Sequence, residues 1–359
     1  MRVLCASTHG AGHFNPLLPY MDACLARGHE VLLAGPPTLD PRGYPFHEGA
    51  SPPEEILAPL WQRLPTLPPG QAEPIVVGRI FAQLNVEAML PSLEAAIEGW
   101  RPDLVVRDPN EYASAIAAER HGLRHVRVAI GLALTESGAL TLASPALEER
   151  EPGITARIAA SPYLSCFPPS FDPADHEVRR YRDPAVDTPA GPLPDWWQGD
   201  ERPLVYVTFG SVAGAFTAAR PLFGEAVRQV AALPVRVLLT LGRELEVGEV
   251  PENVHVEEWV PQADVLGHAA AVVHHGGSGT TLGALAHGVP AVVVPLFADQ
   301  PFNAIRVTAT GAGLHATVDE IGSRLERILA EPSYRAGAER LAAELRALPP
   351  VERFLDDLP

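Results

Sequence analysis

Short apolar segments alternate with longer amphipathic ones along most of the chain. In the N-terminal part, apolar runs suited to buried strands lie at 2–7, 30–35, 103–108 and 125–130, with helix-like stretches between them. Strands that are apolar throughout and alternate with helices are typical of a parallel sheet covered by helices on both faces. The first half is therefore predicted to form a doubly wound α/β domain.

The same alternation begins again after a break. Residues 187–203, "DTPAGPLPDWWQGDERP", are rich in proline, glycine and charge and lack hydrophobic periodicity, which is typical of a linker. Further strand-like runs follow at 204–210, 235–242, 253–260, 271–276 and 291–296. We predict two Rossmann-like domains, 1–195 and 204–345, joined by a linker at 196–203. The segment 346–359 is expected to pack back on the first domain, and ligands are expected in a deep cleft between carboxyl strand ends.

Composition narrows the function classes. The chain has 359 residues, 47% of them hydrophobic and 20% charged, so it can bury sizeable cores. Its net charge of -17 repels phosphate backbones and anionic lipid, which disfavours nucleic-acid and membrane partners. The sequence shows no signal peptide and no long apolar run, and its three widely spaced cysteines form neither a disulfide framework nor a zinc pattern. A cytoplasmic location is expected.

All 27 of the lysine-plus-arginine positions are arginine. Codon bias explains such a composition, but its chemical consequences hold whatever the origin. A Schiff base on lysine and a Walker-type phosphate loop are both excluded. Because arginine stays protonated, a general base has to be another type of side chain.

The stretch "STHGAGHFNP", 7–16, follows the first strand-like run and opens a helix. Gly10 and Gly12 form a G-x-G fragment of the dinucleotide fingerprint. The second run ends "LLAGPP", without the carboxylate that would hold a ribose, so a nicotinamide oxidoreductase is disfavoured. His13 lies at a strand-to-helix junction, where an imidazole can act as a base.

Asp108 ends the run 103–108 and is predicted to lie on the same sheet edge as His13. A carboxylate in that place would hold the tautomer of a histidine base. Other interpretations stay open. His13 could cap or pack its helix, Asp108 could cap the helix that follows it, and His9 is a rival base.

A second chemical motif is "VVHHGGSGTT", 272–281. Two histidines end a strand-like run, and a glycine-rich turn with unobstructed N–H groups leads into a helix near Thr280. Free amides, a helix N-terminus and hydroxyls are suited to a phosphate. The next run ends "PLFADQP", which brings Asp299 and Gln300 to the same edge, where they could hold sugar hydroxyls or cap a helix. Trp259 in "EEWVPQ" could receive a planar base.

The stretches "GHFNPLLP" and "EEWVPQADVLGHAAAVVHHGGSGTTLGALAHGVPAVVVPLFADQPFNA" together resemble nucleotide-sugar-dependent glycosyltransferases of the two-Rossmann-domain (GT-B) type. Natural-product enzymes, such as actinobacterial antibiotic glycosyltransferases, are the most similar group. The resemblance implies that 1–195 binds the acceptor and 204–345 the donor. It implies that His13 is the catalytic base and Asp108 its partner. It assigns the diphosphate to His274, Gly276, Gly277, Ser278, Gly279, Thr280 and Ser211, the sugar to Asp299 and Gln300, and the nucleobase and ribose to Trp259, Val260, Gln262 and Leu282.

Two departures from the family pattern matter. Members that use UDP-sugars often carry a ribose-binding glutamate where this chain has Leu282. An apolar side chain there favours a dTDP-activated deoxysugar. The acceptor-shaping region 51–99 also looks short, and a hydrophobic polyketide-like aglycone is the expected acceptor.

The resulting expectation is an inverting glycosyltransferase that needs no metal or other cofactor beyond its dTDP-sugar. A UDP-sugar transferase, a nucleotide-sugar epimerase and a non-catalytic partner protein remain alternatives. Whether the chain forms a homodimer is left open.

Overall fold

A computed structural model describes residues 1–68, 70–187, 189–210, 220–242 and 250–356. The chain divides into two compact units. Unit 1 contains Met1–Ser165, Ala174–Tyr181 and Pro349–Pro359, and unit 2 contains Cys166–Pro173 and Arg182–Leu348. The chain therefore passes between units earlier than the expected linker at 196–203. In addition, Cys166–Pro173 belongs to unit 2, because its backbone bonds to that unit: Arg306 Nε donates to the Phe171 carbonyl at 2.6 Å.

Unit 1 contains a seven-stranded sheet in the order β3-β2-β1-β4-β5-β6-β7. All of its pairings are parallel. The strands are β1 (Arg2–Ala6), β2 (Glu30–Gly35), β3 (Phe46–Glu48), β4 (Leu104–Arg107), β5 (Arg124–Val128), β6 (Tyr163–Ser165) and β7 (Arg179–Arg180). The central strands are buried almost throughout, as the uniformly apolar runs predict.

Unit 1 also contains helical segments. They are α1 (Ala11–Phe14), η1 (Asn15–Leu17), α2 (Leu18–Ala26), α3 (Glu54–Arg63), η2 (Leu64–Thr66), the π-helical η3 (Pro74–Asn85), α4 (Val86–Trp100), α5 (Tyr112–Arg120), α6 (Ala133–Arg150), α7 (Ile154–Ala160) and α15 (Arg353–Asp356). One core contains Leu4, Ala6 and Val105 of the sheet with apolar side chains of α4, α5 and α6. The single helix predicted after β1 is divided into α1, η1 and α2. The division falls at Pro16, whose ring nitrogen cannot donate a helical hydrogen bond.

Unit 2 contains a six-stranded sheet in the order β10-β9-β8-β11-β12-β13, again with parallel pairings. The strands are β8 (Leu204–Thr208), β9 (Arg236–Thr240), β10 (Val254–Glu257), β11 (Ala271–His274), β12 (Ala291–Val293) and β13 (Gly313–His315). The helical segments are η4 (Pro184–Asp187), α9 (Arg220–Ala231), α10 (Gln262–Leu266), α11 (Ser278–Ala286), α12 (Gln300–Ala309), η6 (Val318–Glu320), α13 (Ile321–Ala330) and α14 (Pro332–Ala347).

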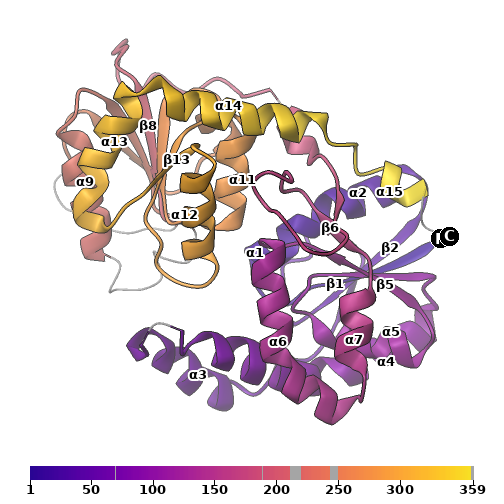
Figure 1. Ribbon diagram of the computed structural model, residues 1–359. Helices are drawn as coiled ribbons and strands as arrows, with labels where there is room; N and C mark the ends of the chain where they lie inside the picture. The colour runs from indigo at the N-terminus through magenta and orange to yellow at the C-terminus, as the bar shows by residue number, and fades with distance from the viewer. Residues whose placement is uncertain (69, 188, 211–219, 243–249, 357–359) are drawn as a thin grey trace. The chain divides into compact units, whose positions relative to one another are not determined.

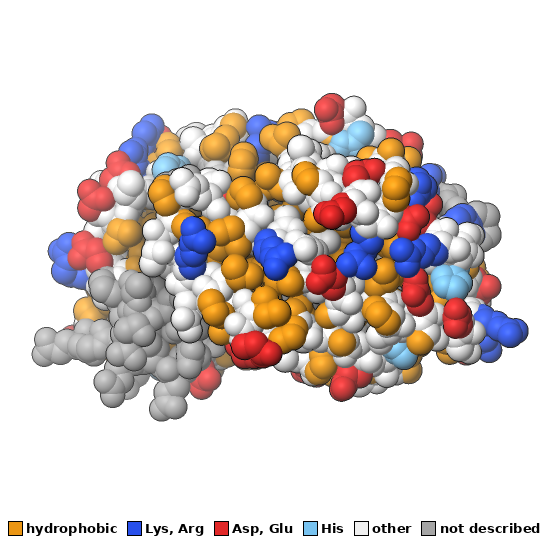
Figure 2. Space-filling model, turned by 90° about the horizontal axis from the view of Figure 1, so that it is seen from below, with side chains coloured by type: hydrophobic (Ala, Val, Ile, Leu, Met, Phe, Trp, Pro, Cys, Tyr) orange, Lys and Arg blue, Asp and Glu red, His pale blue; other side chains and the backbone are white. Residues whose placement is uncertain are grey.

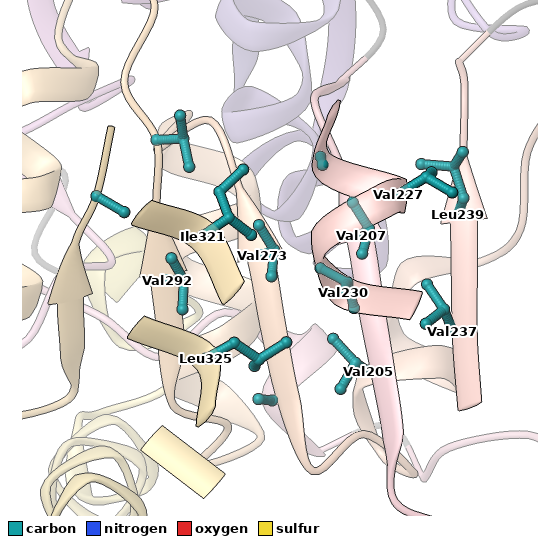
Figure 3. Close-up of a cluster of buried hydrophobic side chains, with 14 of the residues drawn as sticks. Val205, Val207, Val227, Val230, Val237, Leu239, Val273, Val292, Ile321 and Leu325 are labelled. Atoms are coloured by element: carbon teal, nitrogen blue, oxygen red, sulfur yellow. The ribbon is translucent and has the colours of Figure 1, made fainter. Parts of the chain in front are cut away.

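The main core of unit 2 lies between one face of its sheet and two helices. In Figure 1, α9 and α13 lie on one side of this sheet and α11 and α12 on the other. Figure 3 shows the first of these contacts: strand residues Val205, Val207, Val237, Leu239, Val273 and Val292 face Val227 and Val230 of α9 and Ile321 and Leu325 of α13. Burying each such side chain contributes about 1.5–3 kcal/mol. This packing fixes where the carboxyl ends of the strands lie.

Each sheet has one point at which the winding direction reverses. In unit 1 this point lies between β1 and β4, and in unit 2 between β8 and β11. Loops at the carboxyl ends of such strand pairs are where open α/β sheets bind ligands. His13 and Asp108 follow the first pair, and Gly210 and His274 lie at the end of the second.

The surface mixes side chains of opposite charge. In Figure 2, acidic side chains and arginines lie next to one another across the visible face, with hydrophobic side chains between them. The net charge of -17 is therefore not gathered into one patch on that face. Among the residues described, no helix combines the length and apolar character needed to cross a membrane.

Candidate active site

His13 is presented by the turn that follows the central strand of unit 1. After β1, Gly10 takes a φ of +109°, a conformation that favours glycine, and caps the start of α1. His13 lies in this short helix, and its side chain keeps 19% of its surface exposed. The imidazole is therefore accessible to a ligand.

The imidazole of His13 pairs with the carboxylate of Asp108. Nδ1 of His13 lies 3.2 Å from Oδ1 of Asp108, whose side chain is fully buried. A carboxylate accepts, so Nδ1 carries the proton in this contact and Nε2 is left as the basic atom. The structure thus brings together the two residues that the sequence placed at one sheet edge.

Asp108 is held by more than the histidine. Burial by itself raises its pKa, but the His13 charge and several hydrogen bonds outweigh burial and leave the pKa below its ordinary value. The other donors are the Thr8 N–H and hydroxyl (2.7 and 3.1 Å), the Ser7 hydroxyl (3.4 Å), and the N–H groups of Asn110 (2.8 Å) and Glu111 (3.1 Å). Asp108 therefore stays ionised and also ties the β1 and β4 loops together. It does not cap α5, because Glu111 occupies that position.

An aromatic ring borders the imidazole. The ring of Phe81, on η3, packs edge-on against His13 with the ring centroids 5.5 Å apart. Leu134, at the start of α6, is 67% exposed at the same sheet edge. The rival His9 has a different partner, since its Nδ1 lies 3.1 Å from the Thr38 hydroxyl.

Sequence reasoning missed Glu136, a buried acid on α6. Its Oε1 accepts the N–H groups of Ile130 and Gly131, both at 2.8 Å, and so holds the loop after β5. Burial raises its pKa to about 8, although these bonds and one from Tyr163 act in the opposite direction. The available sequence signal was a glutamate in the first turn of a helix that follows a glycine-containing loop.

In unit 2 the glycine-rich turn follows β11 as predicted, and α11 begins at Ser278, two residues before the expected start at Thr280. Gly277 is its N-cap and no side chain caps the helix. The first N–H groups of α11 therefore point toward the carboxyl edge of the sheet without a side-chain acceptor. Such a helix end favours an anion.

Of the two histidines of this turn, His274 faces the interior and His275 is half-buried. His274 is fully buried, and its Nδ1 accepts the Gly276 N–H at 3.0 Å. Burial lowers the pKa of His274 to about 3 and that of His275 to about 4, so both are neutral at physiological pH. A side chain at Gly210 or Gly277 would collide with the His275 ring, which explains these glycines. His274 therefore stabilises the turn through its hydrogen bond with the Gly276 N–H. Its contact with a phosphate stays a prediction.

The side chains of Asp299 and Ser278 form a direct hydrogen bond. The Ser278 hydroxyl donates to Asp299 Oδ2 at 2.7 Å, and Asn303 Nδ2 lies 3.1 Å from the same oxygen. Asn303 is a residue that sequence reasoning did not single out, although it stands inside the quoted "DQPFNA". The hydroxyl hydrogen of Ser278 is thus directed at Asp299.

The side chain of Gln300 forms hydrogen bonds within the protein. It is buried, and its Oε1 accepts the N–H groups of Leu296 and Phe297 at 2.7 and 3.0 Å. Its side chain shapes the loop after β12, and its expected contact with the sugar is untested.

The predicted nucleobase segment lies after β10. Trp259 is 71% exposed, which leaves its indole accessible to a planar ring. Gln262 donates to the Thr280 hydroxyl at 3.1 Å and so connects this segment to α11. Val260 and Leu282 are half-buried. Ser211, the last predicted phosphate contact, lies outside the described residues.

No cluster of three or more His, Cys, Asp or Glu side chains suited to a metal occurs in the part of the chain that the structure describes. Independence of metal remains an expectation.

Comparison with known proteins decides the family. Models of the N-terminal and C-terminal domains of erythromycin biosynthesis protein CIII-like proteins match residues 74–210 and 224–356. The L-demethylnoviosyl transferase of Streptomyces niveus is 33% identical over 96% of this chain and 94% of its own length. The chain belongs to the erythromycin biosynthesis protein CIII-like glycosyltransferases.

Solved structures agree with the fold of this glycosyltransferase. SnogD from Streptomyces nogalater is 29% identical with a TM-score of 0.81, covering 100% of this chain and 98% of its own. SsfS6 from Streptomyces sp. SF2575, a glycosyltransferase solved with thymidine diphosphate, is 27% identical with a TM-score of 0.76, covering 99% of both chains. The predicted fold class, two doubly wound parallel-sheet domains of the GT-B type, is confirmed.

Proposed function

We propose that this glycosyltransferase transfers a sugar from a dTDP-activated donor to a hydroxyl of a hydrophobic natural-product aglycone, with inversion at the anomeric carbon. The observation that carries the proposal is the contact of His13 Nδ1 with Asp108 Oδ1 at the switch point of unit 1. It leaves Nε2 of an accessible imidazole as a base, which is what the removal of a proton from an alcohol requires.

Unit 1 is proposed to hold the acceptor. Phe81 supplies apolar surface beside the base, and Leu134 is an exposed apolar side chain at the same edge of the sheet. Such surface suits a polycyclic or macrocyclic aglycone better than a free sugar, whose hydroxyls would need polar partners.

Unit 2 is proposed to hold the donor. The uncapped start of α11 would bind the diphosphate, Trp259 would stack on the base, and Asp299 would bind sugar hydroxyls. Leu282 offers nothing to a ribose 2′-hydroxyl, which supports dTDP over UDP. The solved relative with thymidine diphosphate agrees with this preference.

The proposed reaction is a single displacement. The acceptor oxygen gives its proton to His13 Nε2 and forms a bond to the anomeric carbon. The bond from that carbon to the diphosphate oxygen breaks, and dTDP leaves with the electron pair. Asp108 stabilises the imidazolium, while the α11 N-terminus stabilises charge on the leaving group.

A ligand-binding screen tests the donor assignment. Thermal unfolding would be followed with dTDP, UDP, GDP and ADP at equal concentrations. A nucleotide at about 100 times its dissociation constant adds roughly 2.7 kcal/mol, so dTDP should raise the midpoint and the others should raise it less. Stabilisation by UDP without dTDP would overturn the assignment. Conversion of a dTDP-sugar without any acceptor would indicate an epimerase instead.

A further inference from the structure

We infer that Asn303 is a positioning residue that joins the diphosphate-binding turn to the sugar-binding loop, so that both parts of the donor are recognised as one unit. The inference rests on the proposed donor site, and it assigns a role to a side chain that itself touches no ligand. Asn303 lies in the first turns of α12 and is fully buried.

The amide nitrogen of Asn303 reaches three acceptors from two loops. Nδ2 lies 2.8 Å from the Gly276 carbonyl, which belongs to the turn after β11. It also lies 3.1 Å from Ser278 Oγ and 3.1 Å from Asp299 Oδ2. With two hydrogens, Nδ2 can donate one to Gly276 and share the other between the two side-chain oxygens.

A hydrogen bond between Ser278 and Asp299 connects two of these three acceptors. The Ser278 hydroxyl donates to Asp299 Oδ2, the oxygen that Nδ2 also approaches. Asp299 Oδ2 is therefore contacted by a side chain of α12 and by one of α11. Loss of Nδ2 would remove the contact that joins the Ser278–Asp299 pair to the Gly276 carbonyl.

The backbone at Gly276 packs closely against its neighbours. Gly276 has a φ of +90°, and a side chain there would meet Val293 Cγ1 at 2.8 Å and the Gln300 carbonyl at 3.0 Å. The glycine turn thus lies directly on the start of α12. Asn303, on α12, stabilises this contact through its hydrogen bond to the Gly276 carbonyl.

The amide nitrogen makes the side-chain hydrogen bonds of Asn303. Among the described residues, Oδ1 of Asn303 is buried without a hydrogen-bond partner. A buried acceptor without a partner destabilises the folded state. The contribution of the side chain therefore rests on its Nδ2 contacts with Gly276, Ser278 and Asp299.

Binding to dTDP measures the inference directly, with Asn253→Ala as the matched control. Asn253 also donates to two backbone carbonyls of unit 2, Ala231 at 3.1 Å and Val235 at 2.9 Å, but it precedes β10 at the opposite edge of the sheet. By calorimetry, Asn303→Ala should raise the dTDP dissociation constant about tenfold or more. Asn253→Ala should change it less than twofold while lowering the unfolding midpoint. Equal binding by both variants would overturn the inference.

A second variant separates positioning from folding. Asn303→Asp keeps the size of the side chain but places a carboxylate against Asp299, so that the pair takes up a proton more readily. A protonated Asp at 303 can donate again, whereas alanine cannot. The dTDP affinity of each variant would be divided by that of wild type at the same pH. This ratio should rise for Asn303→Asp as the pH falls from 8 to 5, and it should stay low for Asn303→Ala. His274 and His275 remain neutral over this range, because burial lowers their pKa values to about 3 and 4.

The outcomes distinguish this inference from the proposed function. If wild-type protein binds none of dTDP, UDP, GDP and ADP, the donor site and the inference both fail. If wild type binds dTDP and Asn303→Ala binds it equally well, only the inference fails. An equal rise in the relative dTDP affinity of both Asn303 variants at pH 5 would also contradict the positioning role.

Discussion

Nδ1 of His13 lies 3.2 Å from Oδ1 of Asp108, although 95 positions separate the two residues in the chain. Strand pairing explains the contact. β1 and β4 are parallel neighbours in which Ala6 is paired with Arg107, so the residues that follow each strand emerge side by side. The sheet reverses its winding direction between these strands, and the pair therefore lies where a ligand has access.

Replacing His13 by alanine should lower turnover by about 10²–10⁴-fold, the usual contribution of a general base. The dissociation constant for dTDP should stay within a few-fold of wild type, because the donor is assigned to unit 2. Steady-state kinetics and calorimetry would measure the two effects. His9→Ala is the matched control and should retain turnover, since His9 bonds to Thr38 instead. Full activity of His13→Ala would remove the assigned base.

Asp108→Asn should reduce both turnover and stability. An asparagine places an NH₂ group among the Thr8, Asn110 and Glu111 N–H donors, so at least one donor loses its acceptor at a cost of about 1–3 kcal/mol. His13→Ala also removes a hydrogen-bond donor from this buried carboxylate, so it should lower the unfolding midpoint as well. A midpoint for Asp108→Asn equal to that of wild type would contradict the role assigned to these bonds.

The same carboxylate predicts an acid dependence. Its folded pKa is lowered, so its stabilising contribution is present above the unfolded value of 3.8 and is lost as the pH falls below it. The difference in unfolding midpoint between wild type and Asp108→Asn should therefore shrink below about pH 4. A constant difference down to pH 3 would speak against an ionised Asp108.

Glu136→Gln should stabilise the protein at alkaline pH. Burial raises the folded pKa of Glu136 from 4.5 to about 8, so in wild type this group reduces stability as the pH rises between those values. The slope is at most about 1.4 kcal/mol per pH unit. Unfolding midpoints at pH 5 and pH 8.5 should show a gain for Glu136→Gln only at the higher pH.

Glu148→Gln is the matched control on the same helix. Glu148 accepts N–H groups from Gly153 and Thr155, but it is only half-buried and hydrogen bonds lower its pKa. Its replacement should therefore bring no gain at pH 8.5. A gain of the same size in both variants would refute the account of Glu136.

Leu282→Glu should change which nucleotide is preferred. A carboxylate on α11 can accept hydrogen bonds from a ribose with both hydroxyls, which UDP has and dTDP lacks. The ratio of UDP to dTDP affinity should rise about tenfold, equal to 1.4 kcal/mol. Leu282→Gln, which lacks the charge, should shift the ratio less. An unchanged ratio in Leu282→Glu would show that this position does not read the ribose.

Much of the fold could be predicted from local pattern. Short runs with an apolar centre, such as 103–108, predicted buried parallel strands, and the structure has β4 at Leu104–Arg107. The glycine-rich turn after β11 and the start of α11 also lie within two residues of their expected places. Pattern was less informative where a proline divided the first helix and where the chain crosses between units at residues 166–173.

The sequence by itself determined which residues stand at strand ends, because the alternation of apolar and polar positions is a local property. From that alone, His13 and Asp108 could be placed on one edge. Only tertiary structure decided where side chains point. It turned His274 into the interior, directed the Ser278 hydroxyl at Asp299, and buried Asn303 between two loops. Those outcomes depend on packing between segments distant in the chain, which no local periodicity encodes.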